Sequence, residues 1–139
     1  MQVGDEKEFT AQVEHASSEI FDLLAVKGKA TEPGAATVPC AGYPDENDVR
    51  QARHAWSLHG APVKDLAGAM ERLREQLPRR GWKIVKDGPD GSRARTPQIV
   101  ADSADGKNSV DVRLLAESEE SDKTSLIEVT VVSACYQQA

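Results

Sequence analysis

The 139-residue chain has few aromatic residues and no long apolar run. Phenylalanine, tryptophan and tyrosine together make up 4% of the sequence, so a hydrophobic core must consist mainly of valine, leucine, isoleucine and alanine. No stretch approaches the roughly 20 apolar residues that a membrane-spanning helix requires. The composition, 39% apolar and 29% charged, is typical of a folded globular protein. The length predicts a single domain over residues 1–139.

Basic residues are scarce relative to acidic ones. The chain has 17 Lys and Arg residues against 23 Asp and Glu residues, and its formal net charge is −6. Non-specific binding to nucleic acid or to an anionic membrane depends on clustered positive charge. Neither class of partner is therefore expected.

An export signal is also missing. The first residues, MQVGDEKEFT, contain neither a basic start nor an apolar centre. This leaves two interpretations: the protein is cytosolic, or an export segment has been removed and Met1 was added in cloning.

Hydrophobic periodicity predicts two helices. The first begins at Asp5, which forms a capping-box arrangement with Glu8, and Gly28 is its expected stop. Its apolar stripe consists of Phe9, Val13, Ala16, Ile20, Leu23 and Leu24. The second helix follows Pro62 and ends at Pro78 and Gly81, with an apolar seam of Val63, Leu66, Met70, Leu73 and Leu77.

The segment between the helices divides into a connector and a strand. Residues 29–48 are rich in Pro, Gly and Ala and are expected to form an irregular loop, which at this length is either functional or pinned. Residues 49–58 alternate, which predicts a strand with one face made of Ala52, His54, Trp56 and Leu58.

Four further strands are expected after the second helix, at 82–86, 96–103, 109–115 and 125–135. Short turns between them indicate mostly antiparallel pairing. The predicted order is α-β-α-β-β-β-β. The predicted fold class is α+β: a two-layer sandwich in which two helices pack on one face of a sheet of four to five strands.

The two cysteines raise the question of a disulfide. Cys40 lies in the connector, and alternation places Cys135 on the same face as Ile127, Val129 and Val131. A thiol in an irregular segment that buries little is best explained by a Cys40–Cys135 disulfide, although two unrelated buried thiols or a reactive thiol are alternatives. A structural disulfide would indicate an oxidising compartment and favour the removed-export-segment interpretation.

The layout resembles the small exported lipoproteins of high-GC Gram-positive (actinobacterial) bacteria over about residues 40–136. The residues that carry the resemblance are the PC at 39–40, the run LPRRGWKIV, the V-x-V-x-L strand and the terminal VVSAC. The resemblance implies an extracytoplasmic location at the cell envelope, with membrane attachment only through an N-terminal lipid anchor that this sequence lacks. It implies no particular chemistry, because many such proteins have no assigned function.

Patterns typical of catalysis or metal binding are not found. The three histidines, His15, His54 and His59, lack the spacing of a zinc protease, and a Cys–His nucleophile pair would need Cys40 free. EF-hand spacing is absent from the turn carboxylates Asp87, Asp90, Asp102 and Asp105. No catalytic residue, metal or cofactor is therefore predicted.

The candidate binding residues are aromatic: Tyr43, Trp56 and Tyr136. The disulfide would bring the two tyrosines close together at one end of the sheet, and exposed aromatic residues often anchor partners. The acidic loop 117–122 is expected to be a solvated loop or a docking site for a basic partner. A cluster of arginines at the end of the second helix complements the helix dipole or meets an acidic partner: Arg72, Arg74, Arg79 and Arg80.

These observations favour a monomeric, non-enzymatic, extracytoplasmic binding domain, the soluble part of a cell-surface lipoprotein, for a protein or small-molecule ligand. The alternative is an immunity or inhibitor protein that neutralises a toxin or enzyme by surface complementarity, since negative surface steers onto a basic site. A third hypothesis is a small hydrolase that uses Cys40.

Overall fold

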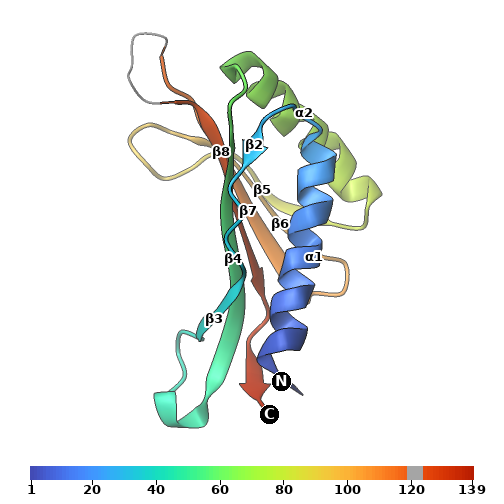
Figure 1. The fold of residues 1–139 in the computed structure, drawn as a ribbon, viewed down its shortest axis with the longest axis vertical. Helices are drawn as coiled ribbons and strands as arrows, with labels where there is room; N and C mark the ends of the chain where they lie inside the picture. The colour runs from blue at the N-terminus through green and yellow to red at the C-terminus, as the bar shows by residue number, and fades with distance from the viewer. Residues whose placement is uncertain (119–123) are drawn as a thin grey trace.

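The computed structural model describes residues 1–118 and 124–139, which form two α-helices, one 3-10 helix and nine strands (Figure 1). The helices are α1 (Glu6–Leu24) and α2 (Val63–Arg79), and the 3-10 helix is η1 (Asp45–Asn47). The strands in chain order are β1 (Gln2–Gly4), β2 (Lys29–Ala30), β3 (Ala36–Pro39), β4 (Val49–His59), β5 (Lys83–Pro89), β6 (Pro97–Asp102), β7 (Asn108–Leu115), β8 (Leu126–Ser133) and β9 (Tyr136–Gln138).

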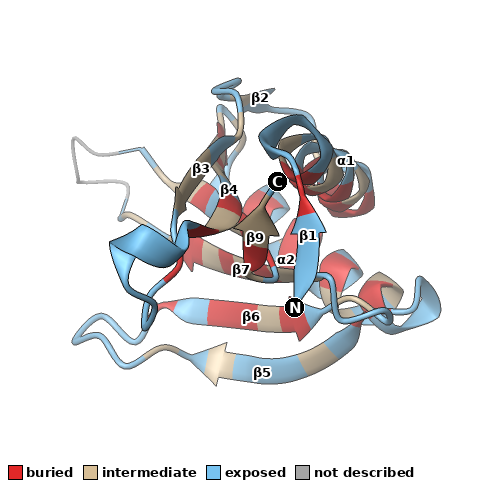
Figure 2. Cartoon of the chain, turned by 90° about the horizontal axis from the view of Figure 1, so that it is seen from below, coloured by how far each residue is buried: buried red, intermediate tan, exposed pale blue. Residues whose placement is uncertain are grey.

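All of these strands belong to one sheet. Its main order is β1-β9-β4-β8-β7-β6-β5, while β2 and β3 pair with β4 off this path. Strands β1 and β9 are parallel, and the other described pairs are antiparallel. The sheet curls into half a barrel around α1 and α2, as Figures 1 and 2 show.

The predicted fold class is therefore wrong. Instead of a sheet of four to five strands with helices on one face, the chain forms a curled mixed sheet of nine strands. The connector, expected to be irregular, supplies β2 and β3, and the two chain ends supply β1 and β9. These strands are two to four residues long, too short for an alternating pattern, and they exist because β4 and β9 offer them backbone partners.

The start of α1 agrees with the sequence, but its end does not. The Asp5 side chain accepts a hydrogen bond from the Glu8 backbone N–H at 2.9 Å, as the capping box predicts. The helix ends at Leu24, where Ala25 adopts a left-handed conformation with φ of 50°. Gly28 has another role: a Cβ there would lie 2.6 Å from the carbonyl oxygen of His59, so glycine permits the close approach of the chain to the end of β4.

The predicted apolar faces form the core between the sheet and the helices, and Figure 2 colours the buried residues red. The whole α1 stripe is buried, and so is the α2 seam except Val63. Strand β4 buries Ala52, Trp56 and Leu58 on the predicted face. Strands β7 and β8 contribute Val110, Val112, Leu114, Ile127, Val129 and Val131.

The predicted disulfide between Cys40 and Cys135 is confirmed, with 6.0 Å between the two Cα atoms. Cys40 follows β3, and Cys135 lies between β8, which ends at Ser133, and β9. Arg50 of β4 pairs with Pro39 of β3 on one edge and with Tyr136 of β9 on the other. The disulfide therefore spans the beginning of β4 and ties both of its neighbours together.

Candidate functional site

The three aromatic residues proposed for binding lie in different surroundings. Tyr136 is fully buried and stacks on Phe9 of α1, with 3.8 Å between ring centroids and 4° between ring planes. Tyr43 is exposed in the loop before η1. Trp56 lies on the concave face of β4 and lines a pocket. Of the three, Trp56 is the one that the structure associates with a concave site.

We call this site the α1–β4 pocket. It has a volume of about 430 Å³ and lies between α1, the connector and β4. The residues that line it are Glu14, Ser17, Ser18, Phe21, Asp22, Ala30, Thr31, Glu32, Pro33, Gly34, His54 and Trp56. The α1 members recur at helical spacing, so they form a second stripe beside the core stripe.

The pocket exists because the connector leaves the edge of β4. Ala30 pairs with Leu58 and Ala36 pairs with Arg53, so the connector covers an interval of six residues where β4 covers five. The extra residue interrupts the ladder as a bulge does. Pro33 has no N–H to donate there, and its carbonyl accepts a hydrogen bond from a side chain instead of from the backbone of β4.

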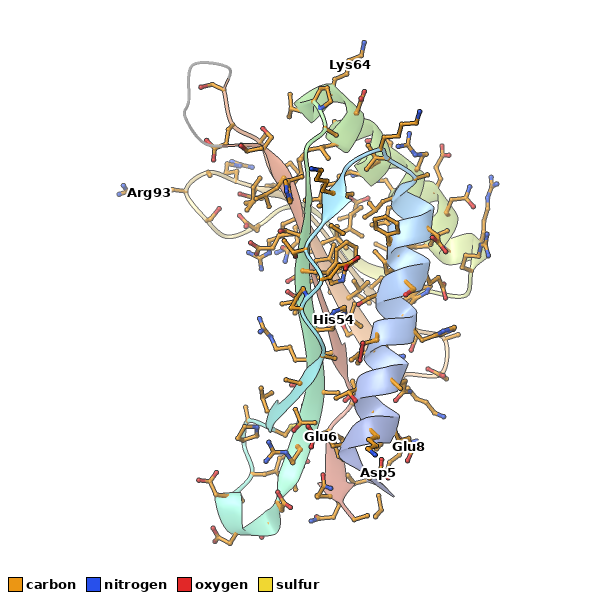
Figure 3. The ribbon with its side chains drawn as sticks, viewed as in Figure 1. Asp5, Glu6, Glu8, His54, Lys64 and Arg93 are labelled. Atoms are coloured by element: carbon orange, nitrogen blue, oxygen red, sulfur yellow. A yellow bond between two sulfur atoms is a disulfide. The ribbon has the colours of Figure 1, made fainter. Side chains whose placement is uncertain are left out.

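That side chain is His54, which joins all three walls of the pocket (Figure 3). Its Nε2 lies 2.8 Å from the Pro33 carbonyl oxygen and its Nδ1 lies 2.7 Å from the Ser17 hydroxyl. A carbonyl oxygen only accepts, so Nε2 carries a proton and neutral His54 accepts from Ser17 at Nδ1. Because both nitrogens are bonded, His54 positions the connector against α1.

An aromatic pair forms the apolar part of the pocket. The rings of Phe21 and Trp56 are 6.1 Å apart between centroids and tilted by 60°, a favourable edge-to-face arrangement. Trp56 is 6% exposed and Phe21 is 40% exposed. The indole N–H of Trp56 is buried without a hydrogen-bond partner among the described residues. An exposed phenylalanine over a buried tryptophan offers a π surface to an incoming group.

The polar part of the pocket is acidic. Glu14, Asp22 and Glu32 are exposed at its rim, and no lysine or arginine lines it. None of the three carboxylates is in an ion pair within residues 1–118 and 124–139. Asp22 also lies in the last turn of α1, where the helix dipole disfavours an anion. These three charges therefore make no evident contribution to the stability of the fold.

Other candidate residues have structural roles. The turn carboxylate of Asp90 accepts hydrogen bonds from the backbone N–H of Ser92 at 2.9 Å and of Thr96 at 3.1 Å, and pairs with Arg113 at 3.1 Å. Hydrogen bonds from the Ser92 side chain and backbone, followed by the Thr96 backbone and the charge of Arg113, lower its pKa. The described part of the chain holds no group of three or more His, Cys, Asp or Glu side chains that could bind a metal ion.

Of the four arginines predicted to cluster at the end of α2, Arg72 and Arg74 make structural contacts, while Arg79 and Arg80 are exposed. Arg72 donates to the carbonyl oxygens of Leu24 at 3.1 Å and of Ala25 at 3.3 Å, and so caps the end of α1. Arg74 donates to both carboxylate oxygens of Asp87 and to Glu71, which raises its pKa further. The acidic loop predicted at 117–122 lies mostly outside the described residues.

Two other hollows carry mixed charge. One, of about 580 Å³, lies beside α1 and the β6–β7 turn and contains Glu19, whose carboxylate accepts from the Trp82 indole N–H at 2.8 Å. The other, of about 500 Å³, is lined on strands of the sheet by residues that include Arg53, Arg113 and Glu128. Neither combines an exposed aromatic ring with unpaired charge of one sign, as the α1–β4 pocket does.

Sequence reasoning identified only part of this pocket. The sequence predicts Trp56 as a binding residue and places His54 on the same face, but it does not single out Glu14, Phe21, Asp22 or Glu32. One signal was present: Phe21 is a large apolar residue outside the core stripe of its helix. The connector residues had no such signal, because their position depends on how the chain pairs with β4.

Comparison with known proteins gives no relative: no protein-family model, curated protein or solved structure matches this chain. Neither α-helix in the described part of the chain is long and apolar enough to cross a membrane. The geometry and charge of the α1–β4 pocket are therefore what indicate a function.

Proposed function

We propose that this protein is a non-enzymatic extracytoplasmic binding domain and that the α1–β4 pocket is its recognition site. The observation that carries the proposal is the pairing of an exposed aromatic ring, Phe21, with three carboxylates that no ion pair uses in the described residues. Local features that cost stability without an evident structural gain concentrate at functional sites.

The chemistry of the pocket supports binding rather than catalysis. His54 is the pocket's natural acid–base group, and both of its ring nitrogens are already bonded to Ser17 and to the Pro33 carbonyl. The Ser18 hydroxyl donates to the Glu14 backbone carbonyl at 3.2 Å. The Ser17 hydroxyl does lie within hydrogen-bond reach of His54, as a nucleophile and its base would, but Ser17 is only 4% exposed, so its oxygen is not open to a substrate. The sulfur of Cys40, the candidate nucleophile of a hydrolase, is bonded to Cys135.

The disulfide supports an oxidising compartment, because structural disulfides persist outside the reducing cytosol. An exported, lipid-anchored protein whose soluble part is this domain would meet that condition. Alkylation of the unreduced protein purified from an oxidising host, followed by mass measurement, should find no free thiol. Two alkylated cysteines would remove the support for an extracytoplasmic location.

The site itself is tested by screening a set of small fragments, with positive, negative and no charge, by nuclear magnetic resonance on isotope-labelled protein. We expect binding fragments to shift the Trp56 indole and the amides of Ser17, Thr31 and Gly34. The Trp82→Phe variant distinguishes the two indole resonances. Fragments that bind only elsewhere, or not at all, would show that the α1–β4 pocket is not the recognition site.

A second candidate function, an inhibitor or immunity protein, is favoured by the acidic rim. Such a protein blocks a basic site on a toxin or enzyme, and negative charge accelerates the encounter. It would form a tight, salt-sensitive complex with the product of a neighbouring gene. Pull-down of that product by the wild-type protein at low salt, weakened by neutralising Glu14, Asp22 and Glu32, would support it.

A further inference from the structure

We infer that the α1–β4 pocket binds the lysine or arginine side chain of a partner protein. This inference rests on the proposed function, because it assumes that the pocket is the recognition site, and it adds the class of partner. It follows from three features of the pocket: its aromatic surface, the sign of its charge and its openness.

The aromatic surface suits a cation with an apolar stem. The face of an aromatic ring attracts an ammonium or guanidinium group, and this attraction is strongest with tryptophan. Phe21 and Trp56 form a tilted pair in the lining, and Phe21, at 40% exposed against 6% for Trp56, is the ring that an incoming cation would meet first. The methylene stem of a lysine or arginine would pack on the same rings.

The charge at the rim selects against anions. Glu14, Asp22 and Glu32 line the same pocket as the aromatic pair, and the lining contains no lysine or arginine to neutralise them. His54, the one basic side chain of the lining, donates its Nε2 proton to the Pro33 carbonyl and so is turned away from a ligand carboxylate or phosphate. An entering guanidinium group would meet carboxylates on both the helix wall and the connector wall.

The openness of the pocket favours a protein partner over a free organic cation. Eight of the twelve lining residues are exposed, so the pocket is wide at its mouth. Sites for small molecules usually enclose 70–90% of the ligand surface. A side chain presented by a partner leaves its own backbone and neighbours to contact the rim, which includes the exposed stretch 31–34 of the connector.

His54 acts here as a positioning residue. It holds Pro33 at 2.8 Å and Ser17 at 2.7 Å, and thereby sets the distance between the connector wall and α1. Its replacement is expected to broaden or displace the connector resonances without changing the charge preference of the pocket. A merely stabilising residue would lower thermal stability and leave those resonances unchanged below the unfolding temperature.

The experiment titrates the isotope-labelled 139-residue protein with three probes: a short glycine-flanked peptide with one arginine, the same peptide with citrulline, and free propylguanidinium. Citrulline has the shape of arginine without its charge. We expect the arginine peptide to shift the Trp56 indole and to bind about tenfold more tightly than the citrulline peptide, with weaker binding at high salt. We expect propylguanidinium to bind more weakly than the arginine peptide.

Two triple variants provide matched controls. Glu14→Gln/Asp22→Asn/Glu32→Gln removes the rim charge and is expected to weaken the arginine peptide about tenfold. Glu46→Gln/Glu75→Gln/Asp102→Asn removes the same charge from exposed residues that do not line the pocket and should leave affinity within about twofold. The rim variant should be at least as stable as wild type, because it removes like charges that have no ion pair in the described residues.

Each contrary result has one meaning. Equal binding of the arginine and citrulline peptides would overturn the cation preference and leave the pocket as a binding site. Propylguanidinium binding as tightly as the arginine peptide would make a free organic cation, not a protein, the ligand. If none of the three probes binds but fragments still bind in the pocket, the inference is overturned and the proposed function is not. If neither the probes nor the fragments bind in the pocket, the proposed function is overturned as well.

Discussion

At the residue scale, the two phenylalanines of α1 have opposite roles. Phe9 is 3% exposed and stacks on Tyr136 in the core, whereas Phe21 is 40% exposed at the α1–β4 pocket. Both lie on the same helix, so intrinsic helix propensity affects them equally. What differs is how much apolar surface each removes from water.

This difference gives a prediction for truncation. Phe9→Ala should lower the free energy of unfolding by about 3–5 kcal/mol, since it leaves a cavity beside Tyr136. Phe21→Ala should cost only about 1–2 kcal/mol, since much of its ring is already solvated, yet it should abolish ligand shifts at the Trp56 indole. Urea unfolding measures both changes. Equal costs would mean that Phe21 belongs to the core.

Tyr136 gives a pH prediction. Its hydroxyl is buried without a hydrogen-bond partner in the described residues, and this burial raises the pKa of the phenol above its usual 10.0. The unfolded state therefore loses the proton at lower pH than the folded state. The stability that follows is present in full below pH 10 and is lost as the pH rises from there through the folded pKa.

The measurement is thermal unfolding of wild type and Tyr136→Phe between neutral and strongly alkaline pH. The variant keeps the ring stacked on Phe9 and has no group to ionise, so its stability should fall less steeply above pH 10. Identical pH profiles would show that ionisation of Tyr136 is not linked to unfolding.

At the scale of elements, the connector shows where glycine is required and where it is not. A Cβ at Gly28 would lie 2.6 Å from the His59 carbonyl oxygen, while a Cβ at Gly34 meets no atom within 4 Å. Gly28→Ala must therefore push the beginning of β2 away from His59 at the end of β4. Gly34 allows alanine, which would reduce only the freedom of the unfolded chain.

We expect Gly28→Ala to destabilise the protein by more than about 1 kcal/mol and Gly34→Ala to leave stability unchanged or raise it by up to about 1 kcal/mol. Chemical denaturation of the two variants checks this directly. If Gly28→Ala were as stable as wild type, the close approach of the connector to β4 would be wrong.

Elements were predictable where a pattern inside the element defines them. The capping box of Asp5 and Glu8 predicts the start of α1, and the alternation of Val110, Val112 and Leu114 predicts β7. The end of α1 was not predictable, because the chain leaves the helix at Ala25 while Arg72, distant in sequence, caps its last carbonyls. The strands of the connector carry no pattern of their own.

At the scale of the whole molecule, the disulfide joins segments that lie on both edges of β4. Its sequence separation of 95 residues closes a long loop in the unfolded chain, which in the chain-entropy model is worth about 4–5 kcal/mol. It also anchors the connector a few residues beyond the wall of the α1–β4 pocket.

The double variant Cys40→Ala/Cys135→Ala should lose about 2–5 kcal/mol of stability. Because β3 and β9 lose their common tie, amides of the connector and of β9 should exchange with solvent faster than those of β7 and β8. Hydrogen exchange of the variant against wild type separates these regions. Uniform acceleration over the whole chain would mean that the disulfide stabilises only globally.

The sequence alone determined the features that short-range chemistry controls. The buried faces of α1, α2 and the long strands follow from periodic burial, and the disulfide was inferred from a thiol that its own segment had no means to bury. The acidic composition predicts that nucleic acid and anionic membranes are not partners, and this stays a prediction.

Only the tertiary structure decided the fold class and the position of the site. Nine strands form because both edges of β4 pair with segments that are distant in the sequence. The pocket lies where the connector has one residue more than the part of β4 that it runs along. Glu14, Glu32 and Trp56 line the same pocket because the curled sheet brings the connector and β4 next to α1. Pairing between segments far apart in the chain leaves no local pattern, and so no window of sequence contains it.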